Sequence, residues 1–128
     1  MSVDGDEVAR IERGLLVLLG IRVGDGPEQA DRIAGKLERL RVFEDAQGRM
    51  NLSVRDIDGE LLVVSQFTLY GDARKGNRPS FVDAAPPEQA EPLYERVRRA
   101  LDAQGGVFGA RMRVSLVNDG PVTLLVET

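Results

Sequence analysis

The apolar run Gly14-Leu15-Leu16-Val17-Leu18-Leu19-Gly20 lies at the centre of the predicted fold. The run is continuous rather than alternating, which is typical of a strand that is covered on both faces. We therefore expect a central β-strand over residues 15–19. The run is far shorter than the roughly 20 apolar residues of a membrane span, and no basic-then-apolar signal pattern precedes it. We expect no membrane insertion and no export.

A hairpin is predicted before this strand, and two helices are predicted after it. Residues 3–8 carry Asp4-Gly5 at their turn, a pair that tight hairpins prefer. The first helix begins at Pro27, and the segment Pro86-Pro87-Glu88 opens the second. Pro92 is tolerated in the second helix only near its start, since a proline further along would kink it. The apolar faces consist of Ala30, Ile33, Ala34, Leu37 and Leu40 in the first helix, and of Ala90, Leu93, Tyr94, Val97 and Leu101 in the second.

The segment between the two helices predicts three further strands. Residues 41–44 and 50–54 are typical of a hairpin with a longer loop. Residues 60–67 follow after another turn at 56–59. Three strands in close succession indicate an antiparallel meander.

The end of the chain predicts a last pair of strands, which completes the fold class. Residues 112–117 and 122–126 are apolar and β-branched, and Asn118-Asp119-Gly120-Pro121 forms a turn between them. The resulting order is βββαβββαββ. It indicates one α+β domain over residues 1–128, with two helices and largely antiparallel, barrel-like β layers.

The composition excludes several kinds of enzyme. The 128 residues include no Cys and no His, so catalytic triads, Cys-His pairs, His-ligated zinc and disulfides are all ruled out. The absence of cysteine and the high content of charge favour a cytoplasmic protein. The formal net charge is −4, and any contact with a nucleic acid must therefore be local.

Two polar segments could carry chemistry. Residues 65–69 are polar where a buried strand ends, the kind of place where a scaffold positions site residues; fraying into a loop is the simpler alternative. Ser65 or Thr68 could act as a nucleophile, but no histidine exists to activate a hydroxyl. Arg74, Lys75 and Arg78 form a plausible phosphate-contacting loop or, equally, a solvated one. No phosphate loop, dinucleotide fingerprint or metal-ligand cluster is present, so we expect no cofactor and no metal.

Together these segments resemble the D-aminoacyl-tRNA deacylase family. The two signature motifs are similar to Ser65-Gln66-Phe67-Thr68-Leu69 and Asn118-Asp119-Gly120-Pro121-Val122-Thr123. Further similar segments are residues 43–45, 50–53, 74–81 and 83–87. Each motif is weak alone, but the similarity as a whole extends over nearly the whole chain with its segments in the right order.

The resemblance implies a cytoplasmic hydrolase that proofreads translation. It would cleave the ester between a D-amino acid, or glycine, and the terminal adenosine of tRNA, with no role for DNA or a membrane. The resemblance assigns the catalytic pocket to Ser65, Gln66, Phe67 and Thr68, with main-chain N–H groups near Phe67 and Thr68 stabilising the oxyanion. It further implies that Gly120 and Pro121, joined by a cis bond, enter the partner subunit's site in a homodimer and reject L-amino acids. Secondary substrate contacts would come from Leu69, Asn118, Val122 and Thr123, and tRNA phosphate contacts from Arg74, Lys75 and Arg78.

Several alternatives stay open at this point. The reactive hydroxyl is either that of Thr68 or the 2′-hydroxyl of the tRNA, and the missing histidine favours the RNA group. Family members usually carry a further strand before the equivalent of Ser2-Val3 and a longer connection before Gly106. Here that strand is missing and the connection is short, which motivates a non-catalytic tRNA-binding relic as a competing hypothesis. A related editing domain that acts on L-seryl-tRNA is another.

Overall fold

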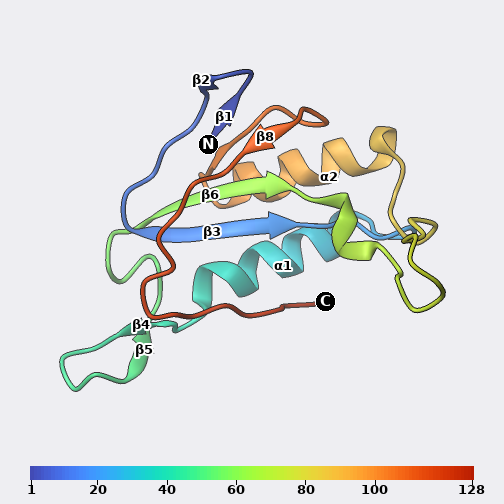
Figure 1. Ribbon diagram of the computed structural model, residues 1–128. Helices are drawn as coiled ribbons and strands as arrows, with labels where there is room; N and C mark the ends of the chain where they lie inside the picture. The colour runs from blue at the N-terminus through green and yellow to red at the C-terminus, as the bar shows by residue number, and fades with distance from the viewer.

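The computed structural model describes all residues 1–128 and shows two helices packed on a small parallel sheet (Figure 1). The predicted α+β class with two helices is confirmed, the predicted order of helices and strands holds as far as α2, and no barrel closes. The elements are β1 (Ser2–Val3), β2 (Asp6–Glu7), β3 (Gly14–Leu19), α1 (Pro27–Arg39), β4 (Phe43–Glu44), β5 (Met50–Leu52), β6 (Glu60–Ser65), the 3-10 helix η1 (Phe67–Tyr70), α2 (Pro87–Ala100), β7 (Gln104–Gly105) and β8 (Met112–Arg113).

The core sheet has the strand order β3-β6-β7, and its strands are parallel. The register of β3 and β6 runs from Gly14 opposite Glu60 to Leu19 opposite Ser65. Parallel neighbours need a crossover connection, and the segment that contains α1 supplies it. The predicted meander is therefore wrong, because β4 and β5 form a separate two-stranded sheet. The predicted central position of residues 15–19 is also wrong, since β3 lies at the sheet edge and β6 is central.

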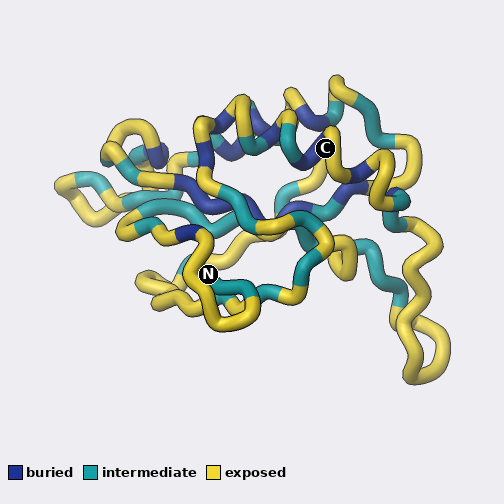
Figure 2. The backbone as a smooth tube through the Cα atoms, turned by 90° about the horizontal axis from the view of Figure 1, so that it is seen from above, coloured by how far each residue is buried: buried dark blue, intermediate teal, exposed yellow.

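Side chains of β6 alternate between two apolar clusters. Leu61 and Val63 belong to the main core with both helices, whereas Leu62 and Val64 pack in a smaller cluster with Ala9, Met112 and neighbouring apolar residues. In Figure 2 buried residues concentrate in the helices and the strands, while the loops and much of the chain end are exposed. β6 is thus covered on both faces, as a continuous apolar run predicts.

The first hairpin forms as expected. Ser2 pairs with Glu7 and Val3 with Asp6, and β1 pairs on its other side with β8. Asp4 and Gly5 have φ values of 51° and 84°. Positive φ at both central residues matches the twist of a two-residue hairpin, which explains the preference for Asp-Gly.

Both predicted helices are present and lie on the same side of the core sheet (Figure 1). Pro27 and Pro87 occupy first helical positions, where a missing N–H costs no helical hydrogen bond. Pro92 lies in the first half of α2 with its side chain exposed, and the helix continues to Ala100. Between the helices, Arg96 of α2 donates to Asp31 of α1 at 2.8 and 2.9 Å.

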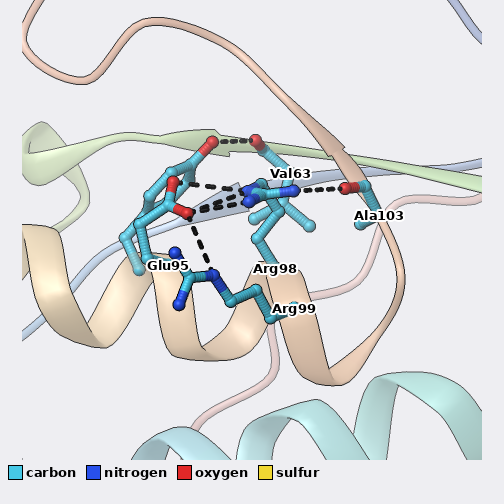
Figure 3. Close-up of polar contacts among 6 residues, drawn as sticks. Val63, Glu95, Arg98, Arg99 and Ala103 are labelled. Atoms are coloured by element: carbon cyan, nitrogen blue, oxygen red, sulfur yellow. Dashed lines mark hydrogen bonds and ion pairs between the residues drawn. The ribbon is translucent and has the colours of Figure 1, made fainter.

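Helix α2 is tied to the core sheet by polar contacts, which Figure 3 draws. The buried Tyr94 hydroxyl donates to the main-chain carbonyl of Val63 at 2.8 Å. Arg98 donates to the carbonyl of Ala103 at 3.1 Å and to the Glu95 carboxylate at 2.8 Å. These bonds fix the connection into β7 and hold β6, the strand that leads to the candidate site.

The end of the chain does not form the two predicted strands. Only Met112–Arg113 is a strand, and residues 114–128 are irregular. The only main-chain hydrogen bond involving residues 114–128 runs from the N–H of Asp119 to the carbonyl of Val117. This segment, which we call the tail, thus lacks a neighbouring strand within the chain. Separately, no helix is long and apolar enough to cross a bilayer.

Candidate active site

The predicted catalytic segment lies where β6 ends and η1 begins. Ser65 is the last residue of β6, and the N–H of Gln66 donates to the carbonyl of Leu19 at 2.8 Å. The strand therefore ends two residues earlier than the predicted limit at residue 67. The sheet fixes the start of the segment, while the side chains of Phe67, Thr68 and Leu69 reach the surface.

Thr68 has no partner that could act as a base. Its hydroxyl oxygen accepts a hydrogen bond from the side-chain amide of Gln66. An amide N–H donates and cannot take up a proton, so this contact orients the hydroxyl without activating it. The geometry favours Gln66 and Thr68 as positioning groups.

The main-chain amides of Phe67 and Thr68 are free to bind an acceptor. These residues open η1, so their N–H groups have no acceptor inside that helix. No loop carbonyl or side chain accepts from them either. Two neighbouring free N–H groups at the surface suit an oxygen that becomes negative during a reaction.

An aromatic pair borders these amides. The rings of Phe67 and Phe81 lie 5.3 Å apart in an edge-to-face arrangement, and Phe67 is 56% exposed. Main-chain bonds of 2.7 and 2.8 Å between Asp72 and Ser80 close the intervening loop and bring Phe81 back to the site. A Cβ on Gly71 would lie 2.9 Å from the Phe81 ring, so glycine is needed there. Sequence reasoning gave Phe81 no role in the site, because this contact depends on the loop closure.

A hollow of about 290 Å³ continues from the segment along the same edge of the protein. Tyr70 lies in it, and burial, followed by the nearby charges of Asp25 and Glu127, raises the pKa of its phenol. The phenol consequently stays protonated and can donate a hydrogen bond. The lining residues are Leu69, Tyr70, Gly71, Asp72, Ala73, Arg74 and Asp83.

Among the predicted phosphate-contacting cations, Arg74 is already paired. Its guanidinium donates to both carboxylate oxygens of Asp72, at 2.9 and 2.7 Å. Lys75 and Arg78 are exposed and have no carboxylate within ion-pair distance. Lys75 and Arg78 are therefore free cations near the middle of the loop, whereas Arg74 is held by Asp72 near the start of the loop.

We expect the Asp72 carboxyl to titrate at an unusually low pH. The side-chain and main-chain hydrogen bonds from Arg74 lower its pKa from 3.8 to about 2. A depressed folded-state pKa means that the pair favours folding above pH 3.8, and that this contribution is lost as the pH falls through about 2. Carbon-detected NMR titration should show this midpoint, and Arg74→Gln should return it toward 3.8. A midpoint near 3.8 in the unmodified chain would contradict the pairing.

The second motif forms a turn in the tail. The Gly120–Pro121 bond is cis, as expected from the resemblance. Asn118 holds the turn: its amide donates to the Thr123 hydroxyl at 3.0 Å, and its carbonyl oxygen accepts from the N–H of Val122 at 3.2 Å. In the structure, Asn118 and Thr123 thus shape the motif that presents Gly120 and Pro121.

The structure does not bring the two motifs together within one chain. In Figure 1 the red tail reverses direction on the side of the view where β3 begins, at the opposite end of β3 from η1. The tail then runs back toward its end, where Glu127 comes near enough to affect Tyr70. A site that uses both motifs would need the tail turn of a second copy.

The sequence and the fold of this chain are both similar to those of known proteins. The sequence matches the family described as D-Tyr-tRNA(Tyr) deacylase over residues 1–127. It is 53% identical over 133 aligned positions to the D-aminoacyl-tRNA deacylase of Halalkalibacterium halodurans, covering 100% of this chain and 91% of that protein. A solved structure of the c-Myc DNA Unwinding Element Binding Protein aligns with a TM-score of 0.93 and 41% identity, over 99% of this chain and 90% of that chain. A second solved structure, described as a probable eukaryotic D-amino acid tRNA deacylase, has the same fold. It aligns with a TM-score of 0.68 and 19% identity, over 86% of this chain and 83% of that chain.

Proposed function

The chain belongs to the D-Tyr-tRNA(Tyr) deacylase family, and we propose that it hydrolyses the ester that joins a D-amino acid to the 3′ end of tRNA. The observation that carries this proposal is the pair of free main-chain amides at Phe67 and Thr68, beside an open hollow. As an enzyme acting on tRNA, it would work in the cytoplasm. Glycyl-tRNA would be a second substrate, because glycine has no side chain for the site to reject.

The reaction needs groups that stabilise charge rather than a protein nucleophile. Water adds to the ester carbonyl, the bond to the ribose oxygen breaks, and that oxygen takes up a proton, which releases free tRNA and the amino acid. The amides of Phe67 and Thr68 would stabilise the oxyanion, and Ser65 and Gln66 would line the pocket for the terminal adenosine. The exposed Phe67–Phe81 pair offers an aromatic surface beside it.

Chiral selection would come from the tail of a second copy. Gly120 and Pro121 would enter the partner's pocket, where their main-chain carbonyls would hold the substrate's amino group and exclude an L side chain. Leu69, Val122 and the turn-forming pair Asn118 and Thr123 would line the same contact. The separation of the tail turn from η1 in Figure 1 supports an arrangement across subunits.

The tail itself supports a homodimer. Val117 and Leu125 are 89% and 79% exposed, and Leu116 and Leu124 are also mostly exposed. A protein rarely leaves so many apolar side chains and unpaired main-chain groups together at its surface without a partner. A second copy of the chain would cover both.

An assay with matched substrates tests the function. The purified protein should hydrolyse a D-aminoacyl-tRNA at least a hundredfold faster than its L counterpart, and duplex DNA should not inhibit it. Equal rates for both enantiomers would overturn the proposal. Binding of tRNA without turnover would indicate the relic, and preferential cleavage of L-seryl-tRNA would indicate the editing domain.

A further inference from the structure

Three cations surround a hollow at the carboxyl end of α1. The hollow has a volume of about 300 Å³ and is lined by Lys36, Arg39, Leu40 and Arg41. In Figure 1 this end of α1 lies toward the start of β3, away from η1. Since α1 is about 20 Å long, the cluster is well separated from the candidate active site.

Three of the carboxylates nearby in the sequence are already engaged, whereas the exposed Glu44 has no partner but lies more than 4.0 Å from each of the cations. Asp31 accepts from Arg96, and Glu38 pairs with Arg55 at 3.2 Å. Asp45 accepts from the main-chain N–H groups of residues 47 and 49. None of the three cations has a carboxylate within 4.0 Å, so their charges are uncompensated on a chain whose net charge is −4.

One of the three cations is held by a hydrogen bond, and another lies along its own helix. The Arg39 guanidinium lies over Gly35, where a Cβ would be only 3.0 Å from its Nη1 atom. Arg41 donates from Nη1 to the side-chain oxygen of Asn51 at 3.2 Å. Guanidinium groups that are already positioned lose less conformational freedom when they bind an anion.

We propose that Lys36, Arg39 and Arg41 bind backbone phosphates of the RNA substrate, at a distance from its 3′ end. This inference rests on the proposed function. The helix dipole favours cations at this end of α1, but it does not explain why three of them surround a hollow without a counter-ion. Phosphates match both the charge and the fork of hydrogen-bond donors that arginine presents. Contact far from the ester would let the protein hold the RNA body while the pocket reads the amino acid.

The test compares how salt weakens binding of uncharged, deacylated tRNA to two variants with the same net charge. The first variant is Lys36→Gln/Arg39→Gln/Arg41→Gln. The second removes three exposed cations elsewhere, Arg10→Gln/Arg111→Gln/Arg113→Gln; Arg111 and Arg113 have no carboxylate within 4.0 Å, and Arg10 makes only a surface pair with Glu12. For the first, the slope of log K against log salt should become shallower by about 2 to 3, and affinity near 0.1 M salt should fall at least tenfold. The second should change the slope by less than 1.

Other outcomes would overturn the inference. Equal slope changes in both variants would indicate a general effect of net charge, and an unchanged slope in the first would remove the phosphate contacts. Loss of polyglutamate binding with an unchanged tRNA slope would assign the cluster to an acidic protein partner. Arg39→Lys/Arg41→Lys, which keeps the charge, should retain most of the slope. If the first variant melts at a much lower temperature, Lys36→Gln alone should still lower the slope by about 1.

The proposed function is tested separately by the unmodified protein. If that protein hydrolyses D-aminoacyl-tRNA and the cluster variant has an unaltered slope of log K against log salt, the proposed function is supported and only this inference is overturned. Lack of turnover, together with a shallower slope in the cluster variant, would support an RNA-binding surface on a protein with another activity.

Discussion

Replacing Gly120 by alanine is expected to lower turnover of a D-aminoacyl-tRNA by roughly a hundredfold and to reduce the preference for D over L substrates by a similar factor. Gly120 has a φ of 153°, and a Cβ there would lie 2.9 Å from the main-chain nitrogen of Val122 and 3.0 Å from its Cγ2. The turn must shift to admit it. The carbonyls of Gly120 and Pro121 would then move, and about 1 Å of misplacement at a positioning group is enough for this loss. Measurement of kcat/KM for paired D- and L-aminoacyl-tRNAs checks it.

Gly109→Ala is the matched control for this substitution. Gly109 also has a positive φ, 77°, but a Cβ there would meet no atom within 4 Å. Alanine therefore brings similar local backbone strain without displacing a neighbour. Turnover should remain within about threefold of the unmodified protein. Equal losses in the two variants would show that the tail turn has no specific role.

A mixing experiment shows whether the tail acts in the partner's site. Phe67→Pro removes one proposed oxyanion donor, and proline suits this first position of η1 because the N–H that it lacks has no acceptor inside the helix. Each variant alone should be impaired. In a heterodimer of Phe67→Pro and Gly120→Ala, a site shared across subunits has one intact copy, so random mixing should restore about a quarter of normal activity. No restoration after mixing would place both motifs in one subunit's site.

Local chemistry accounts for the parts of the fold that the sequence predicts well. The first hairpin depends on Asp4-Gly5, and the two helices begin at prolines that suit a first helical position. Each of these signals acts over a few residues. The residues involved therefore favour the observed conformation through contacts within a few positions of the chain.

The pairing of the strands depends on non-local contacts, and there the prediction was wrong. The turn at residues 56–59 suggested that β6 continues a meander with its neighbours in sequence. The better signal was the pair of continuous apolar runs at residues 15–19 and 61–64 with a helix between them, which is typical of parallel strands. Burial of both faces of β6 outweighs pairing with the short β5.

The tail also shows that strand formation depends on non-local contacts, because its sequence favours strands that the chain does not form. Residues 112–117 and 122–126 have strand-forming side chains, but a strand needs a neighbour to bond with. Within this chain only Met112 and Arg113 find one, in β1. The candidate site was similarly predictable only in part, because residues 65–69 mark it by their own polarity, whereas Phe81 joins it through the loop closed by Asp72 and Ser80.

The absence of a base near Thr68 leads to the second large effect. Removal of the 2′-hydroxyl from the terminal adenosine should slow hydrolysis of a 3′-linked D-aminoacyl ester by about 10²- to 10⁴-fold. Thr68→Ala should cost less than tenfold, because the main-chain N–H at residue 68 remains. Single-turnover rates on ribose and 2′-deoxyribose substrates, for both forms of the protein, provide the comparison.

The two effects distinguish the possible mechanisms. If Thr68 were the nucleophile, Thr68→Ala would abolish turnover and the deoxy substrate would be cleaved normally. The structure argues otherwise, since the Thr68 hydroxyl accepts from the Gln66 amide and the chain contains no histidine to take its proton. A 2′-hydroxyl that takes a proton from the attacking water and passes its own proton to the leaving ribose oxygen needs from the protein only main-chain amides to stabilise the oxyanion. The pH dependence of the rate should accordingly show no inflection from an imidazole near pH 6.5, and the protein's part in catalysis would be to position the ester and select its chirality.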